Sequence, residues 1–539
     1  MSAAFGPKPR LLHSFSGYVP PLLERENSQI QVTYDEKRRA ALEEVDGAAF
    51  SRAWLPVSGF SHIGIAETMI GLVYGNNGKL NPKPELALKL STQVGIFFGQ
   101  VIFGWLADAV GRKKMYGFEL VIGEAQEGRT VNIIVMLSIW RFVMGIGIGA
   151  DYPLSSVITS EFSPKHIRGR MMTTVFAMQG FGNFAAALVA LVVTKAYQSQ
   201  INDEGAKADA IDRCWRLLIG LGAVPGCIAL YCRLTIPEIP RFTMYVEQNI
   251  EQAVQDVDTF LCTGTYNIYP DARKFKLLLA MAYTWFALDV AFHTLGLNTP
   301  GMIKSLGYVS KACDDHNAKN SRNILYGVSK GNLILAAGGL IPGYWATFCF
   351  IDSWGRKPIQ LIGSVVLTVL PIAIGIAWDP LHEAIGGYGG GVLISLYCLA
   401  NFFQNFGPNT TTFIVPGEAF PTRYRATAHA ISAASGKLGA IVSQAIFSLL
   451  KGRFNSESSW NDPDPFVKYL MYAFAFFTLS GAAATLLIEE TRGRTLEDIS
   501  NEDQDRFIEN PGPLELGPHD IVGDVVETLP LQRMPSYEA

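Results

Sequence analysis

Long apolar stretches dominate the chain and follow one another at short intervals. Each is long enough to cross a hydrocarbon core of about 30 Å as a tilted helix, and each is apolar around its whole circumference. Ten stretches are clear, and they centre on 87–107, 131–158, 170–196, 215–234, 276–298, 328–351, 357–378, 390–408, 427–450 and 467–488. This pattern predicts an all-α polytopic membrane protein.

Two further apolar regions, 53–75 and 115–123, are weaker than the other ten. The first is barely long enough for a span, and the second gives way to the polar run GEAQEGRT at 123–130. About eight apolar residues make only about 12 Å of helix. We therefore expect twelve helices, of which helices 1 and 3 are truncated by an internal deletion or an imperfect gene model.

Composition agrees with this class and excludes others. The chain is 49% hydrophobic and only 17% charged, whereas soluble domains are about 25% charged. Its net charge of −4 lacks the basic excess of a nucleic-acid binder. The seven cysteines show no metal-ligand or disulfide-framework spacing. Because no Walker A, G-x-S-x-G or H-E-x-x-H pattern is present either, we expect no enzyme, no metal site and no cofactor.

Basic clusters follow every second predicted span, and the positive-inside rule then places these loops and both termini in the cytoplasm. The clusters are GRKK at 111–114, PKHIRGR at 164–170, RKFK at 273–276, GRK at 355–357 and PTRYR at 421–425. The expected organisation is a cytoplasmic N-terminal tail over 1–50, an N-terminal helix bundle over 51–234, a central cytoplasmic loop over 235–275, a C-terminal helix bundle over 276–490 and an acidic cytoplasmic tail over 491–539.

Charged motifs recur in the same order in the two bundles. D-x-x-G-R-K at 108–113 returns at 352–357, and a Glu followed by Arg seven residues later occurs in each half. Parallel repeats of this kind hold a substrate between the halves near the middle of the membrane. We interpret the motifs as charge pairs that lock an inner gate, although topology anchoring and helix capping remain an alternative. The residues are Asp108, Arg112, Glu161, Arg168, Asp352, Arg356, Glu418 and Arg425.

Four segments carry a resemblance to a known family. They are GWLADAVGRKKM (104–115), MGIGIGADYPLSSVITSEF (144–162), WFALDVAF (285–292) and FFQNFGPNTTTFIVPGEAFPTRYRATAHAISAASGKLGA (402–440). Together they resemble the fungal and plant proton-coupled inorganic phosphate symporters of the major facilitator superfamily. The resemblance implies two six-helix bundles and the import of phosphate with protons across the plasma membrane by alternating access.

The resemblance also implies a substrate site, with His293 standing where the family carries a tyrosine. The substrate-binding positions are Tyr152, Gln179, Trp285, Asp289, Asn409 and Lys437, together with His293. It further implies that Asp151 and Asp289 couple phosphate to protons. Two carboxylates would repel a phosphate anion unless one of them is protonated, which gives a physical reason for coupling.

The alternatives stay open at this stage. Asp151, Asp289, Arg141 and Lys437 lie within apolar spans, so they are either functional groups or buried ion pairs. His62 and His293 are proton carriers or packed polar residues. The acidic residue that the family carries on helix 1 is absent, and Glu67 is off the matching position. The competing functions are a carrier of another oxyanion or of a sugar, and a sensor or transport-defective paralogue. The sequence leaves the oligomeric state open.

Overall fold

The computed structural model describes residues 62–75, 80, 82–110, 133–234, 272–300, 303, 318–383, 389–421, 424–454, 466–494, 496 and 499. Within these ranges every regular element is helical. The first helix group consists of α2 (His62–Tyr74), α3 (Pro82–Val110), α5 (Ile133–Phe162), α6 (Arg168–Ala196), α7 (Gln198–Ile201) and α8 (Lys207–Leu234). The second helix group consists of α11 (Ala272–Leu297), α13 (Ala318–Leu335), the π-helix η2 (Ala336–Leu340), α14 (Ile341–Trp354), α15 (Arg356–Glu383), α16 (Gly389–Asn405), α17 (Pro408–Ala419), α18 (Arg425–Phe454) and α19 (Phe466–Thr485).

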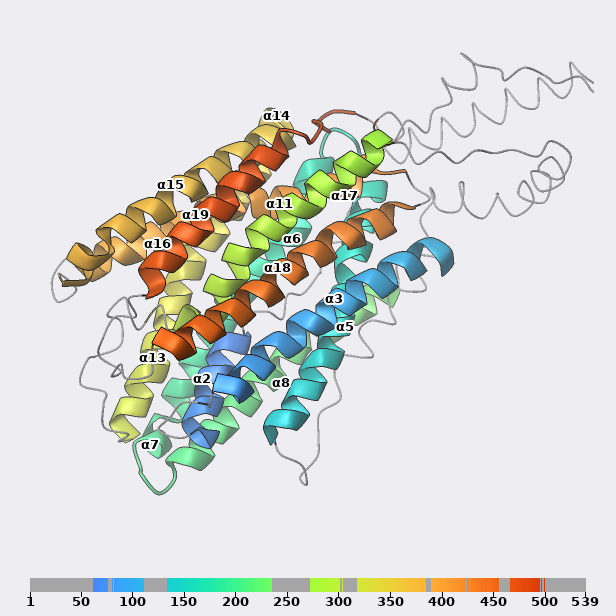
Figure 1. Cartoon of the computed structure of the whole chain (residues 1–539). Coiled ribbons are helices and arrows are strands. Elements are labelled where there is room, and N and C mark those ends of the chain that lie inside the picture. The colour runs from blue at the N-terminus through green and yellow to red at the C-terminus, as the bar shows by residue number, and fades with distance from the viewer. Residues whose placement is uncertain are drawn as a thin grey trace, which may run out of the picture.

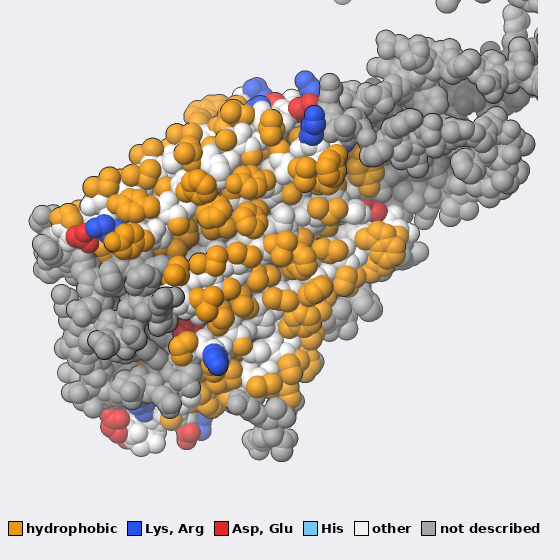
Figure 2. Space-filling model, viewed as in Figure 1, with side chains coloured by type: hydrophobic (Ala, Val, Ile, Leu, Met, Phe, Trp, Pro, Cys, Tyr) orange, Lys and Arg blue, Asp and Glu red, His pale blue; other side chains and the backbone are white. Residues whose placement is uncertain are grey.

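Seven stretches of described helix are long and apolar enough to cross a membrane. They are Pro82–Ala109, Ile133–Glu161, Arg168–Ala196, Lys274–Leu297, Asn320–Trp354, Arg356–Leu381 and Arg425–Leu450. The long helices lie alongside one another in roughly the same direction (Figure 1). Hydrophobic side chains cover most of the face seen in Figure 2, and most of its charged side chains gather toward the ends of the helices. The class expected from the sequence is therefore confirmed: an integral membrane protein built of helices.

All ten predicted stretches lie on described helices, but two of them are interrupted. The stretch predicted over 328–351 contains η2, where the carbonyl of Cys398 and the side chain of Asn401 lie close to Gly339. The stretch predicted over 390–408 breaks between α16 and α17, at Phe406 and Gly407. Pro408 opens the new helix at a position where a proline costs nothing, because the first amides of a helix lack intrahelical partners.

Several expectations fall outside the described residues. These are the N-terminal tail, residues 51–61, the third helix with Arg112, and the central loop over 235–271. Most of the acidic tail belongs with them. The helix over His62–Tyr74 has 13 residues, which is about 20 Å. The truncation of helices 1 and 3 stays a prediction.

Glycines bring α3 and α5 into backbone contact. A Cβ atom added at Gly95 would collide with the carbonyl oxygen of Phe142, and one at Gly149 would collide with that of Ile96. Gly99 and Gly145 face the same interface and are equally crowded. Small residues spaced four apart allow this close approach between membrane helices, as the run GIGIG at 145–149 predicts.

The two helix groups meet along long interfaces. Helix α3 packs against α18, and α6 packs against α14; Figure 1 shows α18 running between α3 and α11. Small residues again mark the contacts, because a Cβ at Gly104 would strike Ala430 and one at Gly180 would lie 3.1 Å from the ring of Tyr344. Polar side chains on the facing sides of α5, α6, α11 and α18 therefore come together between the groups.

Candidate functional site

Three ionisable side chains form a buried cluster between α11 and α18. Lys437 Nζ lies 2.8 Å from Asp289 Oδ2 and 2.7 Å from His293 Nε2. His293 Nε2 is in turn 3.3 Å from Asp289 Oδ2. Asp289 and His293 are four residues apart, which places them on one face of α11. Because all three side chains are almost fully buried, their charges must be balanced within the cluster or by a bound ion.

The close approach of α18 to α11 positions this cluster. A Cβ at Gly439 would lie 2.6 Å from the carbonyl oxygen of Phe286, and one at Gly436 would lie 2.9 Å from Asp289 Oδ2. Lys437 stands between these two glycines in the sequence. The glycines thus let the two backbones come near enough for the lysine to reach the carboxylate.

Aromatic rings enclose one side of the cluster. Lys437 Nζ lies 5.4 Å from the centre of the Tyr152 ring, within the range of a cation–π interaction. The Tyr152 ring contacts Trp285 on α11 and Phe413 on α17 at centroid distances of 6.5 and 6.4 Å. Phe413 stacks on Phe176 of α6 at 4.5 Å. The lysine is therefore buried against aromatic rings on this side, where its charge acts more strongly than in water.

A chain of neutral polar groups continues from these rings. Tyr344 donates a hydrogen bond from its hydroxyl to Gln179 Oε1 at 3.3 Å. Asn409 Nδ2 donates to the Tyr344 hydroxyl at 3.0 Å and to Asn405 Oδ1 at 2.7 Å. The ring of Phe176 packs edge-on against Tyr344 and joins this chain to the aromatic wall. Neutral donors of this kind suit the oxygens of an oxyanion.

The structure therefore brings the seven predicted substrate-binding residues into one region. Tyr152, Trp285, Asp289, His293 and Lys437 form the charged and aromatic part, and Gln179 and Asn409 belong to the polar chain. Asp151 precedes Tyr152 on α5 and is only partly buried. The side chain of His62 lies outside the described residues.

Two members of the polar chain were missed by reasoning from the sequence. Tyr344 carries no charge and lies in an apolar span that resembles any other. Asn405 precedes Asn409 by four residues, but the helix break between them hides that they share a face. At this break the carbonyl oxygen of Asn405 accepts hydrogen bonds from the hydroxyls of Thr347 and Thr410, at 2.8 and 2.7 Å.

A second buried ion pair lies within the first helix group. Glu67 Oε1 on α2 is 2.9 Å from Arg141 Nη1 on α5, and both side chains are at most 8% exposed. Arg141 also donates to the carbonyl oxygen of Leu88 at 3.2 Å. Glu67 therefore forms a buried ion pair, although it does not stand at the position where the family carries its acidic residue of helix 1.

Two carboxylates join the helix groups at the end where the charged motifs lie. Asp352 Oδ1 and Oδ2 accept hydrogen bonds from the backbone amides of Gly169 and Arg170, at 3.1 and 3.0 Å. Asp108 likewise accepts from the amides of Ala426 and Thr427, at 3.3 and 2.7 Å. Each aspartate thus caps the N-terminus of a helix in the other group, where the helix dipole favours negative charge.

The ion pairs at this end differ from those suggested by the spacing within each motif. Glu161 Oε1 lies 2.7 Å from Arg425 Nη1, and both side chains are fully buried. Glu418 lies 2.9 Å from Arg356, which also holds Asp352 at 3.0 Å. Of these pairs, Glu161–Arg425 crosses between the helix groups. Arg168 donates to the carbonyl oxygen of Arg494, and Arg112 lies outside the described residues.

Replacing Glu161 by glutamine tests this crossing pair. The substitution leaves the buried Arg425 without its nearest carboxylate, and breaking a buried pair costs about 3–5 kcal/mol. We expect a clearly lower Tm for the purified protein in detergent. The double substitution E161Q/R425M removes both charges and should recover most of the loss. If E161Q alone has the Tm of the unaltered protein, the pair does not stabilise the contact between the helix groups.

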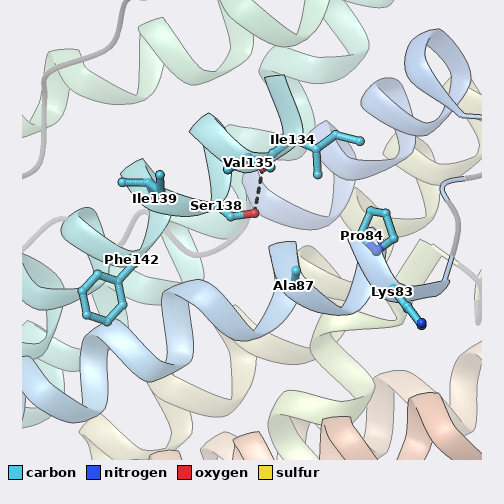
Figure 3. Close-up of a pocket in the computed structure, with 8 residues that line it drawn as sticks. All are labelled: Lys83, Pro84, Ala87, Ile134, Val135, Ser138, Ile139 and Phe142. Carbon is cyan, nitrogen blue, oxygen red and sulfur yellow. Dashed lines mark hydrogen bonds between the residues drawn. The ribbon is translucent and has the colours of Figure 1, made fainter. Parts of the chain in front are cut away.

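A separate groove lies between α3 and α5 (Figure 3) and has a volume of about 550 Å³. It is lined by Lys83, Pro84, Ala87, Ile134, Val135, Ser138, Ile139 and Phe142. Ser138 donates its hydroxyl to the carbonyl oxygen of Ile134, while Val135 and Ile139 are about half exposed. This groove shares no described lining residue with the charged cluster or with the polar chain.

Comparison with known proteins defines the class to which this fold and site belong. The sequence profile described as "Sugar (and other) transporter" matches residues 72–261 and 329–502. The structure resembles that of the major facilitator superfamily proton:xylose symporter XylE bound to 6-bromo-6-deoxy-D-glucose. The TM-score is 0.61 at 18% identity, over 85% of this chain and 97% of that one. The chain belongs to the sugar (and other) transporter family of the major facilitator superfamily.

Its relatives place it more narrowly, among the inorganic phosphate transporters of fungi and plants. It is 40% identical over 529 residues to the repressible high-affinity phosphate permease of Neurospora crassa. The alignment covers 87% of this chain and 90% of that relative. It is also 40% identical to the inorganic phosphate transporter PHO84 of Saccharomyces cerevisiae, over 86% of this chain and 87% of that protein. Inorganic phosphate transporter 1-11 of Oryza sativa is 35% identical, over 80% of this chain and 82% of that protein.

Proposed function

We propose that this protein imports inorganic phosphate together with protons across the plasma membrane by alternating access. The observation that carries the proposal is the buried Lys437–Asp289–His293 cluster, set beside the neutral donors Tyr152 and Asn409 between the two helix groups. The names of the relatives support phosphate as the substrate.

The cluster supplies a physical reason for proton coupling. In the structure Lys437 is bound to Asp289, so its charge is already balanced and attracts an anion weakly. Protonation of Asp289 removes that balance, frees the ammonium group for phosphate, and turns the carboxyl from an acceptor into a hydrogen-bond donor. Loss of the proton restores the ion pair and expels the anion. Phosphate and proton therefore bind and leave together.

The remaining site residues take supporting roles in this proposal. Gln179 and Trp285 offer N–H groups, and Tyr152 a hydroxyl, to the phosphate oxygens. Asn409, whose amide donates to Tyr344 and Asn405 in the structure, turns one N–H group to the anion when it binds. His293 contacts both charges and can share the proton of Asp289, and Asp151 is the second proposed proton carrier. In this proposal Asp108, Glu161, Asp352 and their partners close the cytoplasmic side, and both termini lie in the cytoplasm, as the basic loops favour.

Uptake of labelled phosphate tests the proposal in cells that lack their own phosphate carriers. We expect uptake by cells that express the chain, and we expect a protonophore to abolish most of it. Uptake that persists in the protonophore would refute proton coupling. Uptake of a labelled sugar or of another oxyanion, with no uptake of phosphate, would reassign the substrate.

One observation favours a second candidate, a sensor or transport-defective protein. Glu67, the one acidic residue of α2, is buried and already paired with Arg141, so it is not free to carry a proton. A chain that reaches the cell surface, binds phosphate and moves none would support this candidate over the transporter.

A further inference from the structure

A cavity of about 120 Å³ lies between the two helix groups, next to the charged cluster. Its polar lining consists mainly of carboxamide side chains, which come from four different helices. They are Gln93 on α3, Gln179 and Asn183 on α6, Asn332 on α13, and Asn401 and Gln404 on α16. A hollow shared by both helix groups and lined in this way is a binding space for a polar ligand.

The cavity adjoins the Lys437–Asp289–His293 cluster on the side away from the charged helix ends. His293 and Gln179 line it and also belong to the cluster and its polar chain. Asn183 stands one turn beyond Gln179 along α6, farther from Arg168, where that helix begins. A ligand in the cavity would therefore be in contact with the cluster without yet touching the gate.

Some of the carboxamide atoms lack partners. Within the described part of the chain, Nε2 and Oε1 of Gln93 and Oδ1 of Asn183 are buried without a hydrogen-bond partner. The Gln93 side chain is fully buried. Buried polar groups almost always have a partner in proteins, so these groups are placed to receive one from the cavity.

The charge around the cavity favours an anion. None of its described lining residues is acidic, so no carboxylate repels an oxyanion there. The ammonium group of Lys437 is hydrogen-bonded to His293, which forms part of the wall. Carboxamide N–H groups can bind phosphate oxygens while Asp289 is still ionised and paired with the lysine.

We propose that this cavity is a second oxyanion subsite, in which phosphate is held before Asp289 takes up its proton. The inference rests on the proposed function and adds an order of events to it. The anion first binds to the carboxamides, and protonation of Asp289 then releases Lys437 to accept it. Gln93 is the residue that distinguishes this subsite from the cluster, because it lines the cavity and has no other described partner.

The variant Gln93→Leu tests the subsite through transport kinetics. We expect the KM for phosphate uptake to rise about tenfold, as for a lost net hydrogen bond to an ion, with the maximum rate changed less than about twofold. Gln100→Leu is the matched control. Gln100 lies on the same helix, is fully buried and lacks described partners, but it does not line the cavity. An equal rise in KM for both variants would overturn the proposal.

Phosphate binding to the purified full chain separates the subsite from transport itself. Inorganic phosphate is titrated by calorimetry onto the double variant D289N/K437M, which lacks the lysine that accepts phosphate in the second step, with and without Gln93→Leu. The subsite predicts weak binding to D289N/K437M, reduced at least about fivefold by the added substitution. Binding that ignores Gln93, or no binding at all, overturns it. If the unaltered chain moves no phosphate but shows Gln93-dependent binding, the proposed function fails and the subsite stands.

Discussion

Replacing Asp289 by asparagine is expected to reduce phosphate uptake by about 100-fold or more. Asparagine keeps the shape of the side chain, but it cannot take up and release a proton. It also leaves the buried Lys437 without its carboxylate partner, at a cost of about 3–5 kcal/mol. The measurement is the initial rate of labelled phosphate uptake, normalised to the amount of protein at the cell surface.

The matched control is Asp379→Asn, which breaks an exposed ion pair instead of a buried one. Asp379 pairs with Lys468 at 2.5 Å, but its side chain is 61% exposed, and such pairs contribute at most about 1 kcal/mol. We expect uptake within about twofold of the unaltered protein for this variant. The double variant D289N/K437M should regain thermal stability and remain inactive, which separates transport from folding. Native uptake by Asp289→Asn would remove this residue from the mechanism.

Substituting leucine for Gly149 is expected to prevent accumulation of folded protein. The side chain would begin where the backbone of Ile96 already lies, so α3 and α5 would have to separate along their whole contact. Overpacking of a close interface costs about 1–3 kcal/mol even where neighbours can shift, and here the obstacle is backbone. The readout is the fraction of solubilised protein that elutes as a single species in fluorescence-detected size-exclusion chromatography.

Gly220→Leu serves as the control for this substitution. Gly220 lies on α8, and nothing lies within 4 Å of the position that its Cβ would take. The same addition of apolar volume should therefore leave the elution profile unchanged. A folded Gly149→Leu protein with full uptake would mean that the close contact of α3 and α5 is dispensable.

Most of the fold could be predicted from the sequence because the membrane imposes a simple rule. A chain that leaves water must satisfy its backbone internally, so long apolar stretches become helices. The stretch over 170–196 is one such helix from end to end. The break before Pro408 and the π-helix over Ala336–Leu340 were not predictable in this way. The first depends on hydroxyl groups of Thr347 and Thr410 reaching the Asn405 carbonyl, and the second on contact with α16.

The candidate site likewise contains residues that could be predicted from the sequence and residues that could not. Resemblance pointed to Asp289, Lys437 and their neighbours, and His293, the departure from the family, lies in hydrogen-bonding distance of Lys437. Residues such as Tyr344 and Gln93 are neutral, and their significance lies in what stands opposite them in space. For the same reason the spacing of Glu161 and Arg168 could not reveal that Glu161 contacts Arg425, 264 residues away.

The reciprocal caps made by Asp108 and Asp352 make opening at that end a cooperative event. Each helix group contributes one carboxylate and one helix start, so a rigid-body rotation that parts the groups must release both caps together. If only one cap were released, one aspartate would stay bound while the other entered water, and this intermediate would be less stable than either the fully closed or the fully open arrangement. The contact between the groups at this end therefore rests on two interactions of the same kind, each a carboxylate beside the partial positive charge of a helix N-terminus.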